Sequence, residues 1–165
     1  ITNHYKEAYN LFACCGILFN HESPFRGIEF VTRRITYNLA RIKSGKISKF
    51  TLGNINAKRD WGFAGDYVEA MWQMLQQKEP INYVIATGES HSVEEFLTLA
   101  TEYVGLGDWH DVVEINEANM RPTDIDDLIG NATKAKEKLN WKPKTNFKEL
   151  VKLMVDHDMD YYKLK

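Results

Sequence analysis

The stretch Gly16-Ile-Leu-Phe-Asn-His-Glu-Ser-Pro-Phe-Arg-Gly27 decides how the rest of the sequence is interpreted. It lies where an apolar run, residues 11–19, changes abruptly into a polar segment, residues 20–26. The run has the length of a strand and is apolar on both faces, so it predicts a buried strand of a parallel sheet. Open α/β sheets bind ligands at the carboxyl ends of their strands, and residues 20–26 are therefore a candidate binding loop. The alternative is an ordinary surface loop with a Ser-Pro turn.

Size and composition indicate a globular domain with its own core. The chain has 165 residues, of which 44% are hydrophobic and 27% are charged, and its net charge is -2. This charge predicts no attraction to nucleic acids or to membrane surfaces. No window approaches the roughly 20 apolar residues of a membrane span, and the polar N-terminus does not resemble a signal peptide. Because the chain begins at Ile1 without a methionine, we expect it to be an interior segment of a longer protein.

The two cysteines, Cys14 and Cys15, are adjacent within the apolar run. Neighbouring residues on a strand point to opposite faces, so a disulfide between them is not expected. We interpret them as small buried hydrophobic residues of a reduced, cytoplasmic protein. A catalytic thiol is the alternative, although no activating base can be identified nearby in the sequence.

The spacing of apolar residues predicts an alternation of helices and short strands. Helices are expected over residues 2–9, 30–43, 67–77, 93–104, 131–139 and 147–161, and further strands over residues 49–52, 82–86 and 112–115. In the third helix Asp66 is the expected N-cap, and Val68, Met71, Trp72 and Leu75 form the expected core stripe. Ser92-Val-Glu-Glu95 is a capping box for the fourth helix, and Thr145 is the expected cap of the last.

Four arginines, Arg26, Arg34, Arg59 and Arg121, each lie in a loop or at the start of an element. They come from separate segments, and their convergence on one cleft would make an anion site in a protein of net charge -2. Arg33, beside Arg34, is equally suited to bidentate bonds with phosphate. Arg59 precedes Asp60 and Trp61, which would hold its guanidinium rigid. A small molecule with a pyrophosphate is the ligand that this pattern favours, and ordinary surface charges are the alternative.

Other familiar site patterns are absent from the sequence. The five histidines, including His21 and His91, are dispersed and have no cysteine or histidine partners at metal-ligand spacing. His91 is expected to belong to the entry of the helix at residues 93–104. Neither Gly-x-Gly-x-x-Gly nor a P-loop occurs, and no Ser-His-Asp or Cys-His arrangement can be proposed from residue order.

Several motifs together resemble the GDP-mannose 4,6-dehydratases, which are extended short-chain dehydrogenases/reductases. The motifs are Asn20-His-Glu-Ser-Pro24, Phe30-Val-Thr-Arg-Arg-Ile35, Leu52-Gly-Asn54, Lys58-Arg-Asp-Trp-Gly62, Asp66-Tyr-Val-Glu-Ala70, Val84-Ile-Ala-Thr-Gly88, Arg121-Pro122 and Thr133-Lys-Ala-Lys-Glu-Lys-Leu-Asn-Trp-Lys-Pro143. The Arg-Asp-Trp and Leu-x-Trp-x-Pro patterns are shared among nucleotide-sugar epimerases and dehydratases, whereas the first two motifs are more specific. The resemblance covers nearly the whole chain but only the C-terminal half of such an enzyme.

The resemblance implies a fold and a division into domains. The fold would be α/β: the C-terminal part of an NAD(P)-binding Rossmann-like domain with the smaller α/β substrate-binding domain. Residues 1–19 would end the Rossmann-type domain. Residues 20–165 would form mainly the nucleotide-sugar domain, with some segments returning to the sheet.

The resemblance also implies roles for matching residues. His21 and Arg26 match positions that contact NADP. The positions that hold GDP-mannose are matched by Asn20, Arg34, Arg59, Arg121 and Asp124. The family converts GDP-mannose to GDP-4-keto-6-deoxymannose, the precursor of GDP-fucose and GDP-rhamnose, and a full-length member would be a homodimer or homotetramer.

The chain departs from the family pattern at several positions. Phe25 replaces a common arginine in a loop that meets a neighbouring subunit, Arg34 replaces a lysine, and Asp124 replaces a glutamate. The segment of residues 105–120 is also shorter than the corresponding segment in many relatives. The Tyr-x-x-x-Lys pair, the Thr and Glu of the elimination step and the Gly-rich loop are not in this chain, so we expect no catalysis by these 165 residues alone. A related nucleotide-sugar epimerase or reductase and a non-catalytic binding fragment are the alternative interpretations.

Overall fold

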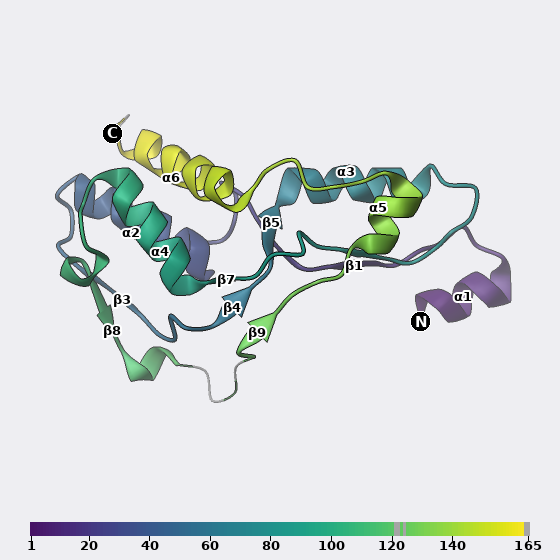
Figure 1. Ribbon diagram of the computed structural model, residues 1–165, viewed down its shortest axis with the longest axis horizontal. Coiled ribbons are helices and arrows are strands. Elements are labelled where there is room, and N and C mark those ends of the chain that lie inside the picture. The colour runs from purple at the N-terminus through teal and green to yellow at the C-terminus, as the bar shows by residue number, and fades with distance from the viewer. Residues whose placement is uncertain (121–122, 124, 164–165) are drawn as a thin grey trace.

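The computed structural model describes residues 1–120, 123 and 125–163 (Figure 1). The helices are α1 (Thr2–Tyr9), α2 (Val31–Lys43), α3 (Ala64–Leu75), α4 (Val93–Val104), α5 (Thr133–Leu139) and α6 (Phe147–Lys163), with 3-10 turns η1 (Trp109–Asp111) and η2 (Glu117–Asn119). The strands are β1 (Gly16–Leu18), β2 (Asn20–Glu22), β3 (Phe50–Leu52), β4 (Lys58–Arg59), β5 (Trp61–Phe63), β6 (Tyr83–Ile85), β7 (His91–Ser92), β8 (Val113–Ile115) and β9 (Asp127–Leu128).

The strands are short and pair mostly in parallel. β1 pairs with β6, β2 with β5, and β3 with β8, each in parallel. β4 lies between β9, which is parallel to it, and β7, which is antiparallel. Because helices alternate with these parallel strands, the predicted α/β class is confirmed.

Two hydrophobic cores lie at opposite ends of the elongated molecule (Figure 1). In the larger core α2, α4 and α6 pack on one another and against the strands β3, β5 and β8. In the smaller core α3 and α5 cover β6. The segment that leads from β1 into β2 connects the two ends, so its residues lie between the cores.

The predicted buried strand over residues 11–19 is shorter and more exposed than the sequence indicates. Only Gly16–Leu18 is a strand before Phe19, and its length matches its three-residue partner β6. Leu11 and Phe12 are exposed, and Ile17 on β1 keeps 55% of its surface in contact with solvent. Residues 20–22 of the expected polar turn form β2, so the turn itself begins at Ser23. The cysteines Cys14 and Cys15 are both free and only half-buried.

The predicted core stripe of α3 is wrong. Val68, Met71, Trp72 and Leu75 are exposed, with Trp72 at 63%, and the buried side chains of α3 include Tyr67, Ala70 and Met74. The buried and exposed stripes are neighbours on the helix surface, because successive residues differ by about 100° in direction. The helix also begins earlier than expected, at Ala64.

The predicted caps are partly confirmed. Ser92 and Glu95 form the expected capping box at the start of α4. Asp66 is inside the first turn of α3 and instead accepts hydrogen bonds from the main-chain N–H groups of Lys144 and Thr145, each at 2.9 Å. The cap of α6 is Asn146 rather than Thr145, because its side chain accepts from Glu149 N while the Glu149 carboxylate accepts from Asn146 N. Among the described helices, none combines the length and apolar character that crossing a membrane requires.

Candidate functional site

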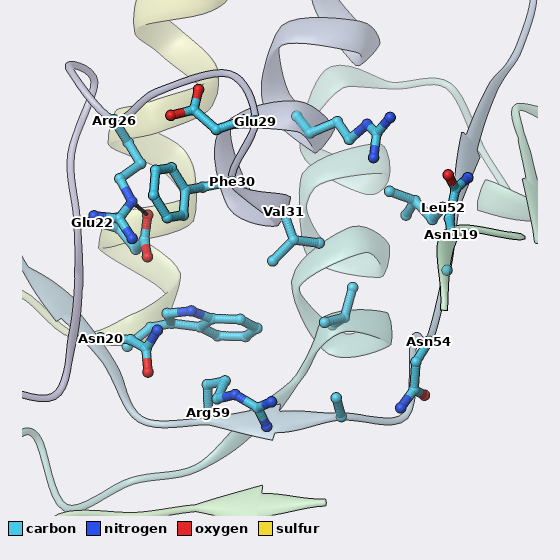
Figure 2. Close-up of a pocket in the computed structure, with 15 residues that line it drawn as sticks. Asn20, Glu22, Arg26, Glu29, Phe30, Val31, Leu52, Asn54, Arg59 and Asn119 are labelled. Atoms are coloured by element: carbon cyan, nitrogen blue, oxygen red, sulfur yellow. Dashed lines mark ion pairs between the residues drawn. The ribbon is translucent and has the colours of Figure 1, made fainter. Parts of the chain in front are cut away.

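A cavity of about 350 Å³ opens between β2, the start of α2 and the end of β3. Figure 2 shows Arg26, Glu22 and Phe30 on one side of it, with Leu52, Asn54 and Asn119 opposite. Arg59 lies at its edge between these two sides. Segments that are distant in the sequence therefore meet at this cavity, as expected for a ligand site in an α/β protein.

Three of the four predicted arginines line this cavity. Arg26 comes from the loop after β2, Arg34 from the first turns of α2, and Arg59 from β4. Asn20 lies at the start of β2 and also lines it. The structure thus brings together guanidinium groups that are separated by up to 33 residues, which supplies the positive charge that a pyrophosphate requires. The other predicted residues, Arg121 and Asp124, lie outside the described residues.

Arg59 is held by main-chain oxygens at the cavity edge. Its Nη1 donates hydrogen bonds of 2.6 Å to the carbonyls of Lys58 and Ile125. The neighbouring carboxylate of Asp60 is fully buried and accepts hydrogen bonds from the Thr87 and Gly88 segment, so it does not have the predicted role beside the guanidinium. Trp61, in turn, stacks on Phe147 in the larger core. Adjacent strand residues point to opposite faces, which directs Asp60 away from Arg59, whereas Trp61 lines the same cavity as Arg59.

Arg26 lies between a carboxylate and an aromatic ring. Its Nε is 3.3 Å from Oε2 of Glu22, and its guanidinium carbon is 3.5 Å from the centre of the Phe30 ring. Glu22 is 2% exposed and accepts a 2.7 Å hydrogen bond from Thr32 Oγ1. Burial raises the pKa of Glu22, while the hydrogen bond from Thr32 and the charge of Arg26 act in the opposite direction.

A second, smaller cavity of about 260 Å³ lies beside the first. Its lining includes His21, Leu18 and Leu128, and it shares Asn20 and Arg26 with the larger cavity. The two shared side chains therefore form the boundary between the cavities. The sequence-based predictions for His21 and Arg26 concern one ligand and the prediction for Asn20 another. The structure places Asn20 and Arg26 at this boundary, and His21 in the lining of the smaller cavity.

His21 lines the smaller cavity and is held by contacts to Phe19 and Tyr67. Its Nδ1 lies 2.9 Å from the carbonyl oxygen of Phe19, and because a carbonyl only accepts, Nδ1 carries a proton. The imidazole packs on the buried ring of Tyr67, with centroids 5.2 Å apart. Burial and the nearby charges of Asp60, Asp66 and Glu22 raise the pKa of Tyr67, which keeps its hydroxyl protonated.

Arg33 does not have the predicted phosphate-binding position. Its guanidinium forms an ion pair of 2.8 Å with Asp158 of α6, and it does not line either of the two cavities. Arg33 and Arg34 are adjacent on α2 and point in different directions, so one arginine faces the cavity and the other the helix α6. The local sequence pattern did not distinguish them, because Asp158 is distant in the chain, whereas the family resemblance implied the binding role for Arg34.

The structure adds cavity residues that the sequence did not single out as binding residues. Glu22, Asn54 and Asn119 all line the larger cavity. Glu22 and Asn54 lie within two of the motifs that carry the family resemblance, so the sequence contained a signal that could have identified them. Asn119, on η2, was recognisable only from the structure: its main chain packs against Gly53, and its Nδ2 donates to Thr51 Oγ1 at 3.2 Å. Within the described residues, no group of histidine, cysteine or carboxylate side chains is arranged to hold a metal ion.

A family model and the most similar known sequences all assign the chain to the same family. A sequence model described as "GDP-mannose 4,6 dehydratase" matches residues 1–154. GDP-mannose 4,6 dehydratase 1 of Arabidopsis thaliana is 62% identical over 162 residues, covering 98% of this chain and 45% of its own length. The human GDP-mannose 4,6 dehydratase is 49% identical and is covered to 47%. The chain thus spans about half the length of the curated relatives it matches.

Solved structures show the same fold at low sequence identity. RMD from Pseudomonas aeruginosa, complexed with NADPH, superimposes with a TM-score of 0.88 at 18% identity, over 97% of this chain and 52% of that protein. UDP-glucose 4-epimerase of Thermotoga maritima, with UDP-glucose, gives a TM-score of 0.77 at 24% identity, over 99% of this chain and 50% of that protein. The chain therefore has the α/β fold of about half of each of these two proteins.

Proposed function

The chain belongs to the GDP-mannose 4,6-dehydratase family, and from this membership we propose that it is the nucleotide-sugar-binding half of such an enzyme. The observation that carries the proposal is the convergence of Asn20, Arg34 and Arg59 on one cavity of about 350 Å³. In the proposed complex Arg34 and Arg59 bind the pyrophosphate of GDP-mannose, and Asn20 binds on the sugar side. Arg121 and Asp124 complete the proposed substrate site.

We propose that the smaller cavity takes part of an NADP molecule. His21 and Arg26 supply a hydrogen-bonding nitrogen and a cation there, which suits the polar groups of a dinucleotide. At about 260 Å³ the cavity is small even for a drug-sized ligand, so residues outside this chain would hold the rest of the cofactor. The RMD protein that shares the fold binds NADPH, which supports the choice of dinucleotide.

When bound, NADP would supply the hydride-transfer chemistry that the proposed dehydration needs, and His21 and Arg26 would help to hold it. This chain contributes orientation: Asn20 and Arg26 at the boundary of the two cavities would hold the sugar next to the cofactor. The product would be GDP-4-keto-6-deoxymannose, a precursor of GDP-fucose. The base and the Gly-rich loop would come from outside these 165 residues, and we expect the isolated chain to show no turnover.

The domain division remains part of the proposal. The pairing of β6 with β1 and the separate core of α3, α5 and β6 support the idea that residues after position 20 return to the dinucleotide-binding sheet. We also propose a cytoplasmic homo-oligomer without nucleic-acid or membrane partners.

The test uses the complete natural polypeptide that carries this chain, with titration calorimetry and product analysis. We expect GDP-mannose to bind more tightly than UDP-glucose, and Arg34→Ala and Arg59→Ala each to weaken GDP binding by about tenfold. Arg41→Ala is the matched control, because Arg41 lies on α2 but does not line the cavity. With NADP, the expected product has lost the C6 hydroxyl. A product epimerised at C4 would indicate an epimerase instead, and failure to bind GDP-mannose would overturn the proposal.

A further inference from the structure

Arg33 joins the last helix to the loop that carries Arg26. Toward α6, its Nε donates to both oxygens of Asp158, at 3.0 and 2.9 Å, and its Nη2 donates to Oδ1 at 2.8 Å. Asp158 is fully buried and also accepts a 2.6 Å hydrogen bond from Thr36 Oγ1. The carboxylate is thus held by two residues of α2, which fixes the plane of the Arg33 guanidinium.

The remaining nitrogen of Arg33 is directed at the loop. Nη1 donates to the carbonyl of Pro24 and, at 3.1 Å, to the carbonyl of Arg26. The same loop contains a turn in which Arg26 N donates to Ser23 O at 3.0 Å. The exposed ring of Phe25 lies edge-on to His157 of α6, with centroids 5.9 Å apart. The loop therefore rests on α6 and on Arg33, and two of its three carbonyls from Pro24 to Arg26 accept from one guanidinium.

This arrangement determines the position of Arg26. With its carbonyl bound to Arg33, the Arg26 side chain leaves the loop toward the boundary of the two cavities. Glu22 and Phe30 then confine the guanidinium from two sides. If the carbonyl were released, the side chain would retain these two contacts but lose the fixed main chain from which it extends.

We propose that Arg33, locked by Asp158, is a positioning residue that sets the guanidinium of Arg26 at the boundary between the dinucleotide and nucleotide-sugar cavities. The proposal rests on the proposed function, which assigns Arg26 to the cofactor. A planar group with five donors is needed, because one set of donors must bind a carboxylate while another binds two carbonyls. Lysine retains the charge but cannot bind both sides in this geometry, so Arg33→Lys separates the positioning role from the charge.

The experiment measures binding and loop order in the complete natural polypeptide. The variants are Arg33→Lys, Arg26→Ala, the double variant, and Arg41→Lys as the matched control. Arg41 is on the same helix but donates to Asn38, at 3.2 Å, and not to the loop. The dissociation constant for NADPH is measured from the fluorescence of the bound dinucleotide. Hydrogen exchange of the amides of Phe25, Arg26 and Gly27 is measured without ligand.

We expect Arg33→Lys to accelerate exchange at these three amides and to raise the dissociation constant for NADPH by about tenfold. In the double variant the loss should not exceed that of Arg26→Ala alone, because Arg33 acts through Arg26. If Arg33 only stabilised the fold, the losses of NADPH affinity in the two single variants would add in the double variant. Arg41→Lys should behave as the wild type in both measurements.

Unchanged exchange in Arg33→Lys, or additive losses in the double variant, would overturn the inference. If Arg33→Lys does not fold, Thr36→Val is the deciding variant. It leaves Arg33 in place and removes the hydroxyl that donates to Asp158 at 2.6 Å and to the Arg33 carbonyl at 3.3 Å, and it should shift both measurements in the same direction. A wild-type polypeptide that does not bind NADPH would overturn the proposed function. The exchange data would still show whether Arg33 holds the loop.

Discussion

At the residue scale, two buried carboxylates arrange the main chain around the candidate site. Asp60 accepts hydrogen bonds from Thr87 N, Thr87 Oγ1, Gly88 N and Gly130 N, between 2.6 and 3.1 Å. It therefore ties three separate segments together next to Arg59. Glu22 is the second, between Thr32 and Arg26. Burying a carboxylate is costly unless its oxygens have partners: Asp60 accepts four hydrogen bonds, and Glu22 accepts one from Thr32 and forms an ion pair with Arg26.

Replacing Asp60 should destabilise the protein and weaken the site. In Asp60→Asn one carboxylate oxygen becomes an NH₂ group that faces main-chain N–H donors, so two accepted hydrogen bonds are lost. We expect the free energy of unfolding to fall by roughly 1–3 kcal/mol, measured by urea denaturation. Asp108→Asn is the control, because Asp108 is exposed and its carboxylate contacts the neighbouring residue His110. Equal stability of the Asp60 and Asp108 variants would contradict the assigned role.

Glu22 should make stability depend on pH. Because burial raises its pKa, the folded state binds the proton more tightly than the unfolded state does. Its contribution to the free energy of unfolding is then largest below the ordinary glutamate pKa of about 4.3, and falls as pH rises through the raised pKa. Glu22→Gln removes this titration.

The stability of wild type relative to Glu22→Gln should therefore decrease as the pH rises above the ordinary glutamate pKa of about 4.3, measured by urea denaturation at several pH values. Thr32→Val removes a hydrogen bond to the charged form, raises the pKa of Glu22 further and should enlarge the decrease. If the difference in the free energy of unfolding between wild type and Glu22→Gln stays constant over this pH range, the Glu22 carboxylate has the same pKa in the folded and unfolded states.

At the element scale, the close packing of η2 on the end of β3 shapes one wall of the larger cavity. A Cβ at Gly53 would lie 2.5 Å from the main-chain oxygen of Asn119. Since that neighbour is backbone, it cannot move away as a flexible side chain can. A glycine is therefore needed at this position for close approach, and not for an unusual backbone angle.

Gly53→Ala should separate η2 from β3. We expect a loss of about 1–3 kcal/mol in the free energy of unfolding and weaker binding of GDP-mannose, because Gly53 and Asn119 both line the cavity. Thermal denaturation and calorimetric titration provide the two measurements. Gly16→Ala is the matched control, since the nearest atom to its added Cβ would be a movable Leu18 side-chain atom at 3.3 Å. Full binding affinity in Gly53→Ala would argue against η2 as a wall of the site.

At the scale of the whole molecule, one apolar surface is left exposed near the smaller core. It comprises Val68, Met71, Trp72 and Leu75 on α3. At the same end of the molecule, α1 contributes no buried residue and is held by hydrogen bonds from Lys6 to Pro80 and between Asn3 and Asn82 (Figure 1). Exposed apolar surfaces of this kind favour association.

The 165-residue chain should therefore self-associate through α3. Trp72→Gln combined with Leu75→Gln should shift its sedimentation profile toward monomer without lowering the melting temperature, because neither side chain is buried. Tyr103→Gln on α4 is the control for removing an exposed aromatic side chain elsewhere. An unchanged association state in the α3 double variant would show that this surface does not drive self-association.

The sequence by itself determined the features that depend on neighbouring residues. Helix α4 with its Ser92–Glu95 capping box and the helix expected over residues 2–9, which is α1, follow from local signals, and the structure confirms them. The motifs around Asn20 and Arg59 also indicated the family, which the comparisons confirm. Their predicted roles in binding remain predictions.

Only the tertiary structure decided features that depend on distant partners. Leu11 and Phe12 are apolar enough for a buried strand, but β1 extends only as far as β6 offers hydrogen bonds. The family resemblance implied a binding role for Arg34, but the local pattern suits Arg33 equally, and only the packing of α6 assigns Arg33 to Asp158. The physical reason is the same in both cases: periodicity and capping are local, whereas burial and ion pairing are decided by the surface that packs against each residue.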